Sequence, residues 1–305
     1  MKNKVLIGSI VTTLLAFMLY AANLRRVEHT NLEIVGQNKK EVLPDSKAKK
    51  KHELKVPEVE YPNQIKVEAG SEQVWAKKIE KVMGKDRSYQ VSVQDLNNGK
   101  YARVANSVKA HGVGASSRIF LLAASYYQEQ EGKLAGKAAV KVKKAEAVKG
   151  DKVLQPGIAY ALTFIRQSMM QGSQTAGNVL LDQVKPTNVD QVAKKMGASD
   201  TKFATKYTAS PLATTTAADL GRVLINLYQN KTLKRQYASL ALGQLNQAKN
   251  RPKVVHTSAG TIYAIGDSKA NLALVETHGR VYCVSVWSEN DQKFTKLGET
   301  IKQFF

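Results

Sequence analysis

Residues 114–127 have the sequence GASSRIFLLAASYY. Small, turn-forming residues precede this stretch, and it continues as an apolar run long enough for a buried helix. A serine in the first turn of such a helix, here Ser116, can be a nucleophile, because helix N-terminal N–H groups stabilise a developing anion. It can also be an ordinary N-cap residue, which is the commoner role of a serine at this position. The choice between these two roles depends on the rest of the chain.

Net charge and the rarer residue types limit the possible functions of this chain. The formal net charge is +21 at pH 7, which indicates a polyanionic neighbour such as nucleic acid, anionic lipid or an anionic wall polymer. The single cysteine, Cys283, excludes an internal disulfide and lies in an apolar run that predicts a core position. The five histidines lack the spacing of metal ligands. We therefore expect neither a metal nor another cofactor.

The N-terminal part of the chain predicts a membrane anchor and a stalk. Residues 5–22 form an uncharged apolar run behind two lysines, and no favourable cleavage site ends it. Residues 1–22 are therefore predicted to be an uncleaved signal-anchor that crosses the cell membrane once. Residues 23–71 are polar and mixed in charge, which is typical of a largely disordered stalk. The remaining domain would be extracellular, which argues against nucleic acid as its partner.

Residues 72–305 are predicted to form a folded domain that is itself basic. Between residues 23 and 71, ten basic residues nearly balance eight acidic ones, so about +17 of the total charge belongs to this domain. Its periodicity gives the order helix, hairpin, many helices, three strands, helix. The expected elements include the hairpin strands 89–96 and 101–104, the helices 158–170, 188–196 and 217–228, the strands 260–267, 270–277 and 281–287, and the helix 294–305. This order predicts an α+β fold: a five-stranded antiparallel sheet built from both ends of the domain, with a helical subdomain inserted between them.

Four segments, in sequence order, resemble the class A β-lactamase and penicillin-recognising serine hydrolase family over about residues 72–305. They are the hairpin 91–100, Ala115-Ser116 before its apolar helix, the segment 168–181, and the helix start 214–220. The resemblance implies a β-lactamase/transpeptidase-like fold. It also implies that Ser116 lies at the position of the nucleophile.

The catalytic motifs that this family requires are degraded in this chain. A lysine three residues after the nucleophile lies on the same helix face and helps to deprotonate it. That position holds Ile119, and Arg118 lies on another face and cannot give up its proton. The other two motifs, Ser-Asp-Asn and Lys-Thr-Gly, fall on Gly172-Ser173-Gln174 and on His256-Thr257-Ser258.

The residues that replace the catalytic motifs could still contact a substrate, but they lack the groups that the family uses for proton transfer. Gln174 could hydrogen-bond a substrate amide, and His256 could hold a substrate carboxylate when it is protonated. β-Lactamases of this family also need a glutamate in the loop after the second motif, yet no glutamate occurs between Glu146 and Glu276. Each missing proton-transfer group costs about 100-fold or more in rate.

Three hypotheses therefore remain open. The first is a membrane-anchored extracellular domain with degraded catalysis, whose basic surface binds anionic wall polymer, peptidoglycan or anionic lipid. The alternative is an active serine hydrolase, of β-lactamase or DD-peptidase type, in which Ser116 uses a non-standard base, either His111 or one of the many lysines brought near it by the fold. The third is an unrelated exported binding domain. In the first hypothesis the basic surface could also bind a protein partner, which the sequence does not identify. The lysine-rich export segment is typical of a Gram-positive surface protein.

Overall fold

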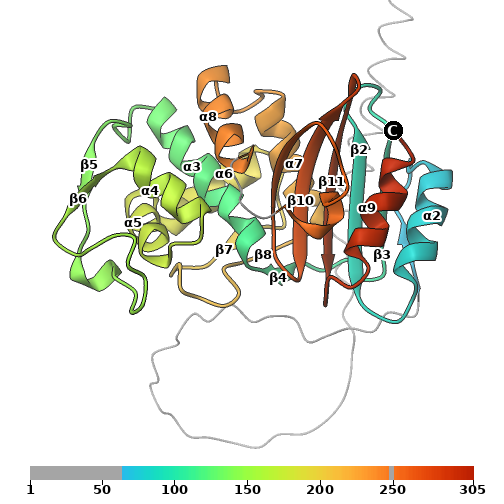
Figure 1. The fold of residues 1–305 in the computed structure, drawn as a ribbon, viewed down its shortest axis with the longest axis horizontal. Helices are drawn as coiled ribbons and strands as arrows, with labels where there is room; N and C mark the ends of the chain where they lie inside the picture. Colours follow the sequence, from blue (N-terminus) through green and yellow to red (C-terminus); the bar gives the residue numbers. More distant parts are fainter. Residues whose placement is uncertain (1–63, 247–250) are drawn as a thin grey trace, which may run out of the picture. The chain divides into compact units, whose positions relative to one another are not determined.

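A central antiparallel sheet with helices on both faces organises the described residues, which are 64–246 and 251–305 in this computed structural model (Figure 1). Its six strands lie in the order β1 (Lys66–Val67), β3 (Tyr101–Ala105), β2 (Tyr89–Asp95), β11 (Arg280–Ser288), β10 (Ala270–Thr277) and β9 (Thr261–Gly266). Strands from the two ends of the domain meet where β2 pairs with β11. The predicted α+β fold with a sheet built from both ends is confirmed.

The sheet has one strand more than the five predicted. Lys66 and Val67 pair with Ala105 and Val104, so β1 adds an edge to the hairpin. The following backbone continues the contact, because the N–H of Arg103 donates to the Ser71 hydroxyl at 3.1 Å. The polar composition of residues 64–71 predicts that they are part of the stalk. In the structure they belong to the folded domain.

One face of the sheet is covered by α2 (Gln73–Met83) and α9 (Phe294–Lys302). Alternate strand residues such as Val91 and Val93 of β2 point to this side and share a core with Ile79 of α2 and Leu297 of α9. The period of two in the predicted strands therefore matches the pleat of the sheet.

The opposite face packs against α7 (Ala217–Tyr228) and α8 (Arg235–Asn246). Thr216 caps α7, since its hydroxyl accepts the N–H of Asp219 at 3.1 Å. Gly221 lets α7 approach the sheet closely, because a Cβ atom there would lie 3.0 Å from the Ser285 hydroxyl. This helix joins the sheet to the helical subdomain.

The helical subdomain lies between the hairpin and the C-terminal strands in sequence. Its helices are α3 (Arg118–Gln130), α4 (Leu162–Met170), α5 (Gln174–Val184) and α6 (Pro186–Lys195). Two small sheets accompany them, one of β4 (His111–Val113), β8 (Ala213–Thr215) and β7 (Lys202–Phe203), and one of β5 (Ala139–Lys141) and β6 (Ala159–Ala161). The helix predicted from residue 158 begins only at Leu162, because residues 159–161 pair with β5.

The predicted signal-anchor, residues 1–22, lies outside the described residues, as does most of the predicted stalk. Within residues 64–246 and 251–305, no helix combines the length and the apolar character that a membrane span requires.

Candidate functional site

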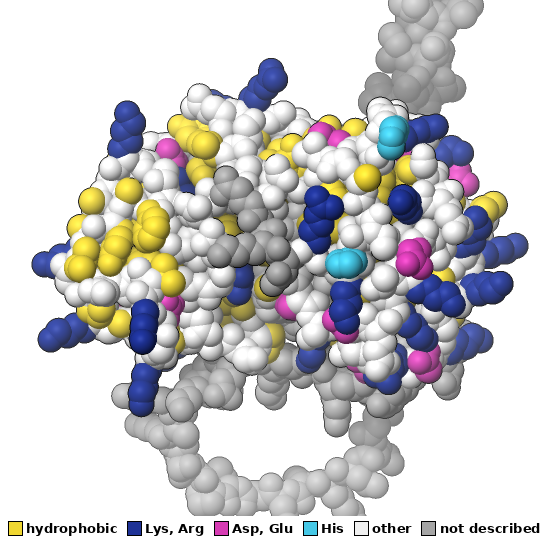
Figure 2. Space-filling view, viewed as in Figure 1, with side chains coloured by type: hydrophobic (Ala, Val, Ile, Leu, Met, Phe, Trp, Pro, Cys, Tyr) yellow, Lys and Arg dark blue, Asp and Glu magenta, His cyan; other side chains and the backbone are white. Residues whose placement is uncertain are grey.

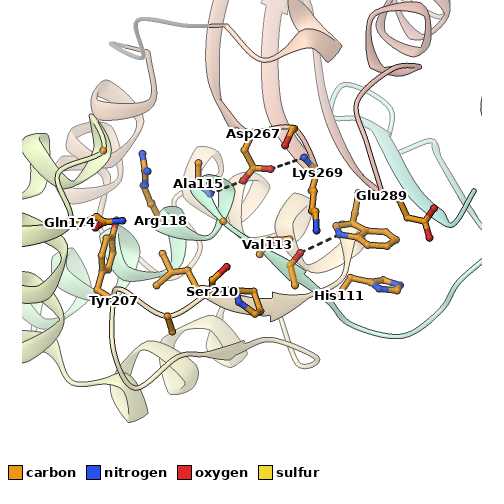
Figure 3. A pocket seen from close by; sticks show the side chains of 18 of the residues that line it. His111, Val113, Ala115, Arg118, Gln174, Tyr207, Ser210, Asp267, Lys269 and Glu289 are labelled. Atoms are coloured by element: carbon orange, nitrogen blue, oxygen red, sulfur yellow. Dashed lines mark hydrogen bonds between the residues drawn. The ribbon is translucent and has the colours of Figure 1, made fainter. Parts of the chain in front are cut away.

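A cavity of about 800 Å³ opens where the start of α3 meets three loops (Figure 3). These are the connection between α4 and α5, the loop before β8, and the turn between β9 and β10. The cavity therefore lies between the helical subdomain and the edge of the sheet.

The start of α3 does not present the predicted nucleophile to this cavity. Between Gly114 and α3, residues 115–117 form a 3₁₀ turn, η1. Ser116 is 0 % exposed, does not line the cavity, and its hydroxyl has no hydrogen-bond partner among the described residues. Ile119, the predicted lysine position, is in the hydrophobic core. The residues of this turn that line the cavity are Ala115 and Arg118.

Asp267 occupies the N-terminal end of this turn. Its Oδ2 accepts the N–H of Ala115 at 2.7 Å, as Figure 3 shows. Its Oδ1 accepts the N–H groups of Lys269 and Ala270 at 2.8 and 2.9 Å. A helix N-terminus can stabilise a developing oxyanion only if its N–H groups are free to donate. Here a carboxylate of the protein already takes up the N–H of Ala115.

Arg118, Gly172, Gln174 and Tyr207 line the cavity on the side of the helical subdomain. Arg118 Nη1 donates to the carbonyl of Met170 at 3.2 Å. Burial raises the pKa of the Tyr207 hydroxyl to about 12, although the nearby Arg118 guanidinium acts in the opposite direction. Tyr207 is therefore protonated at neutral pH.

The segment predicted to replace the second motif divides between two roles. Gly172 and Gln174 line the cavity, but Ser173 does not. The Ser173 hydroxyl caps α5 by accepting the N–H of Ala176 at 3.1 Å, and it donates to Asp151 at 2.7 Å. Ser173 therefore stabilises the helix start and does not face a ligand.

His111, Trp287, Lys269 and Glu289 line the other side of the cavity. The rings of His111 and Trp287 stack with their centroids 3.6 Å apart. His111 Nε2 lies 2.7 Å from the hydroxyl of Ser107, which is buried. The base suggested for Ser116 therefore contacts a different serine.

The residues predicted to replace the third motif lie elsewhere. His256, Thr257 and Ser258 follow the short turn η3 (Lys253–Val255), which packs against α9 on the far face of the sheet. None of the three lines the cavity. The turn that does approach α3 is the one after β9, which carries Asp267.

The cavity is also lined by three polar residues that no sequence motif predicted: Asp267, Tyr207 and Lys269. The spacing of Ala115 and Arg118 is a usable signal. They are three positions apart, as are the serine and lysine of the family's Ser-x-x-Lys motif, and each lies one residue before the predicted positions Ser116 and Ile119. Tyr207 had only its place in the short loop after the second motif. Within the described part of the chain, no group of three or more His, Cys, Asp or Glu side chains is arranged to hold a metal ion.

Comparisons with known proteins agree with this architecture. Solved structures with the same fold include PBP-A, a β-lactamase of Sphaerobacter thermophilus and a β-lactamase of Xanthomonas campestris. PBP-A is 13 % identical, with a TM-score of 0.68 over 76 % of this chain and 96 % of its own. The Sphaerobacter enzyme is 16 % identical, with a TM-score of 0.63 over 75 % and 94 %. The Xanthomonas enzyme is 13 % identical, with a TM-score of 0.66 over 75 % and 97 %.

At these identities the structural matches establish the fold alone, and no curated protein sequence matches the chain. The sequence model described as the β-lactamase enzyme family matches residues 75–304, which is most of the chain and nearly all of the described domain. The protein therefore belongs to the β-lactamase enzyme family.

Proposed function

We propose that this protein is a catalytically inactive member of its family that acts as an extracellular binding protein. Residues 1–22 would anchor it in the cell membrane, and the domain would bind an anionic component of the envelope: wall polymer, peptidoglycan or anionic lipid. The basic composition of the chain supports the choice of an anionic partner.

The inferred loss of catalysis rests on the two residues that the start of α3 presents to the cavity. The cavity wall at the start of α3 holds Ala115 and Arg118, which have the spacing of a Ser-x-x-Lys motif but neither of its reactive groups. An alanine has no nucleophile, and an arginine does not release its proton to serve as a base. Asp267 adds to this, because its carboxylate takes up the N–H of Ala115 and would repel an oxyanion formed there.

The test is acylation of the purified full-length chain by a reactive penicillin, followed by intact mass. We expect the mass of the unmodified chain after long incubation at high drug concentration. A stable adduct on the wild type would overturn the proposal. If that adduct were absent from a Ser116→Ala variant, Ser116 would be the nucleophile despite its burial.

A second candidate function is an active serine hydrolase, and the contact between Ser107 and His111 favours it. A hydroxyl 2.7 Å from an imidazole nitrogen is the arrangement by which histidine activates serine. Ser107 is, however, only 3 % exposed, which fits a structural hydrogen bond better than an attacking group. Labelling by a fluorophosphonate that is lost in Ser107→Ala and kept in Ser116→Ala would select this candidate.

A further inference from the structure

One side of the cavity presents an arginine with unused hydrogen-bonding capacity. Arg118 donates one hydrogen bond to the protein backbone, from Nη1 to the carbonyl of Met170 at 3.2 Å, although a guanidinium carries five N–H donors. Its Nε is buried without a partner. A buried donor without an acceptor is costly, so this arrangement is stable only if a ligand or water supplies the acceptor.

Tyr207 adds a second unpartnered donor to the same side. Its side chain is 5 % exposed and lines the cavity, and its hydroxyl has no hydrogen-bond partner within residues 64–246 and 251–305. The ring is held in place by α5, because a Cβ atom at Gly177 would lie 2.1 Å from it. The hydroxyl is therefore fixed next to the Arg118 guanidinium and keeps its proton at neutral pH.

Gly172 leaves the guanidinium accessible. A Cβ atom at this position would touch both Arg118 Nη atoms, at 3.8 Å each. Without that atom a ligand can approach the planar face and edge of the group, with the exposed side chain of Gln174 at the rim of the same cavity. A guanidinium edge with two adjacent N–H groups matches the two oxygens of a carboxylate or a phosphate.

We propose that Arg118, Tyr207 and Gln174 form a binding site for an oxyanion, a carboxylate or phosphate group on the ligand that enters this cavity. Arg118 would form the bidentate contact and Tyr207 would donate a further hydrogen bond. The proposal rests on the proposed binding function and adds to it the chemical class of the ligand group. It gives Arg118, which follows Ala115 at the spacing of a Ser-x-x-Lys lysine, a role in recognition and not in proton transfer.

Equilibrium dialysis of the full-length chain with radiolabelled inorganic phosphate, and separately with radiolabelled acetate, tests this site. Total ionic strength is held constant with sodium chloride, so that diffuse binding to surface lysines is the same throughout. We expect saturable uptake of about one equivalent of at least one probe. Uptake of phosphate alone would identify a phosphate group on the natural ligand, and uptake of acetate alone a carboxylate. Saturable uptake of neither probe would overturn the proposal.

Substitutions separate this site from the general basic surface. Arg118→Gln is expected to weaken the Kd about tenfold or more, because it removes a charge-assisted bidentate contact. Arg235→Gln is the matched control: Arg235 is exposed on α8 and does not line the cavity, so its Kd should change less than about twofold. Equal binding by both variants would contradict the proposal.

Tyr207→Phe provides a test that does not depend on the folding of the Arg118 variant. The hydroxyl it removes has no partner within the described protein, so the melting temperature should not fall. The Kd should nevertheless weaken several-fold, and an unchanged Kd would remove Tyr207 from the site. The anion-binding test and the acylation test are independent of each other. A penicillin adduct would contradict catalytic inactivity but not the anion site. Absence of saturable anion uptake would contradict the anion site but not catalytic inactivity.

Discussion

At the scale of single residues, Asp267 is a side chain that links the edge of the sheet to the start of α3. It lies in the turn between β9 and β10, yet one of its oxygens accepts the N–H of Ala115 at the start of α3. Its other oxygen closes its own turn through Lys269 and Ala270. Three backbone N–H groups therefore depend on one carboxylate that is partly shielded from water.

Asp267→Ala is expected to lower the free energy of unfolding by about 2 kcal/mol, because partly buried N–H groups lose a charged acceptor. Urea denaturation of the full-length chain measures this loss. Asp200→Ala is the matched control, since the exposed Asp200 carboxylate accepts no hydrogen bond from the described residues, and its cost should stay within about 0.5 kcal/mol. Equal losses in the two variants would show that Asp267 does not hold the turn and α3 together.

The sequence predicted a site residue in the turn before α3, and that turn does line the cavity, but through Ala115 and Arg118 and not through Ser116. Whether the chain enters α3 directly or through a 3₁₀ turn cannot be seen in a periodicity pattern, and the two paths rotate the side chains differently. A shift of one residue turns a helix position by about 100°. That rotation is the difference between Ser116, which is buried, and Ala115, which lines the cavity.

At the scale of elements, the start of α5 shows how a loop without regular structure is held in the helical subdomain. Asp151 Oδ2 accepts the N–H of Thr175 at 2.8 Å and the hydroxyl of Ser173 at 2.7 Å. Burial alone would raise the pKa of Asp151, but these hydrogen bonds from Thr175 and Ser173 outweigh it and hold the pKa below 3.8. The ionised carboxylate therefore stabilises the folded state.

Asp151→Asn is expected to lower the free energy of unfolding by about 1 kcal/mol at neutral pH. Because the folded-state pKa is lowered, this contribution is present above the unfolded-state value near 3.8 and is lost as the pH falls through the folded-state value. Denaturant titrations of both proteins between about pH 7 and pH 3 should thus show a difference that shrinks toward acid. A difference that stays constant or grows toward acid would contradict this role for the carboxylate.

Elements with a long, regular pattern were predictable, and short ones were not. The alternation in β2, the apolar runs of β10 and β11 and the helix start before α7 are local signals, and these elements lie within a residue of their predicted bounds. β1 has two residues, too few to alternate, and it depends on pairing with β3. The segment 256–258 was misplaced because a short turn before a strand gives no information about which face of the sheet it packs on.

At the scale of the whole molecule, positive charge is spread over the domain and is not balanced by acids. Figure 2 shows lysine and arginine side chains gathering over the end of the domain that carries α2 and α9. On α2, Lys77, Lys78 and Lys81 are all exposed, and no ion pair with a described acid involves them. Adjacent positive charges repel each other unless a counterion binds, so a polyanion would be attracted to this helix.

Binding of the full-length chain to a soluble polyphosphate tests this attraction. Affinity should fall steeply between about 0.1 M and 0.5 M salt, because contacts between exposed charges are screened. Reversing the three α2 lysines (Lys77→Glu, Lys78→Glu, Lys81→Glu) should weaken binding about tenfold or more at low salt.

The control for that variant changes the same number of charges in another part of the domain. Lys133, Lys141 and Lys152 are exposed in the helical subdomain, and replacing all three by glutamate gives the same net charge as the α2 variant. If α2 is the contact, the control should lose much less affinity, because near contacts depend on local charge more than on total charge. Equal losses would mean that the polyanion responds to net charge alone and that α2 is not a docking surface. Affinity that did not fall with salt would exclude the electrostatic contact altogether.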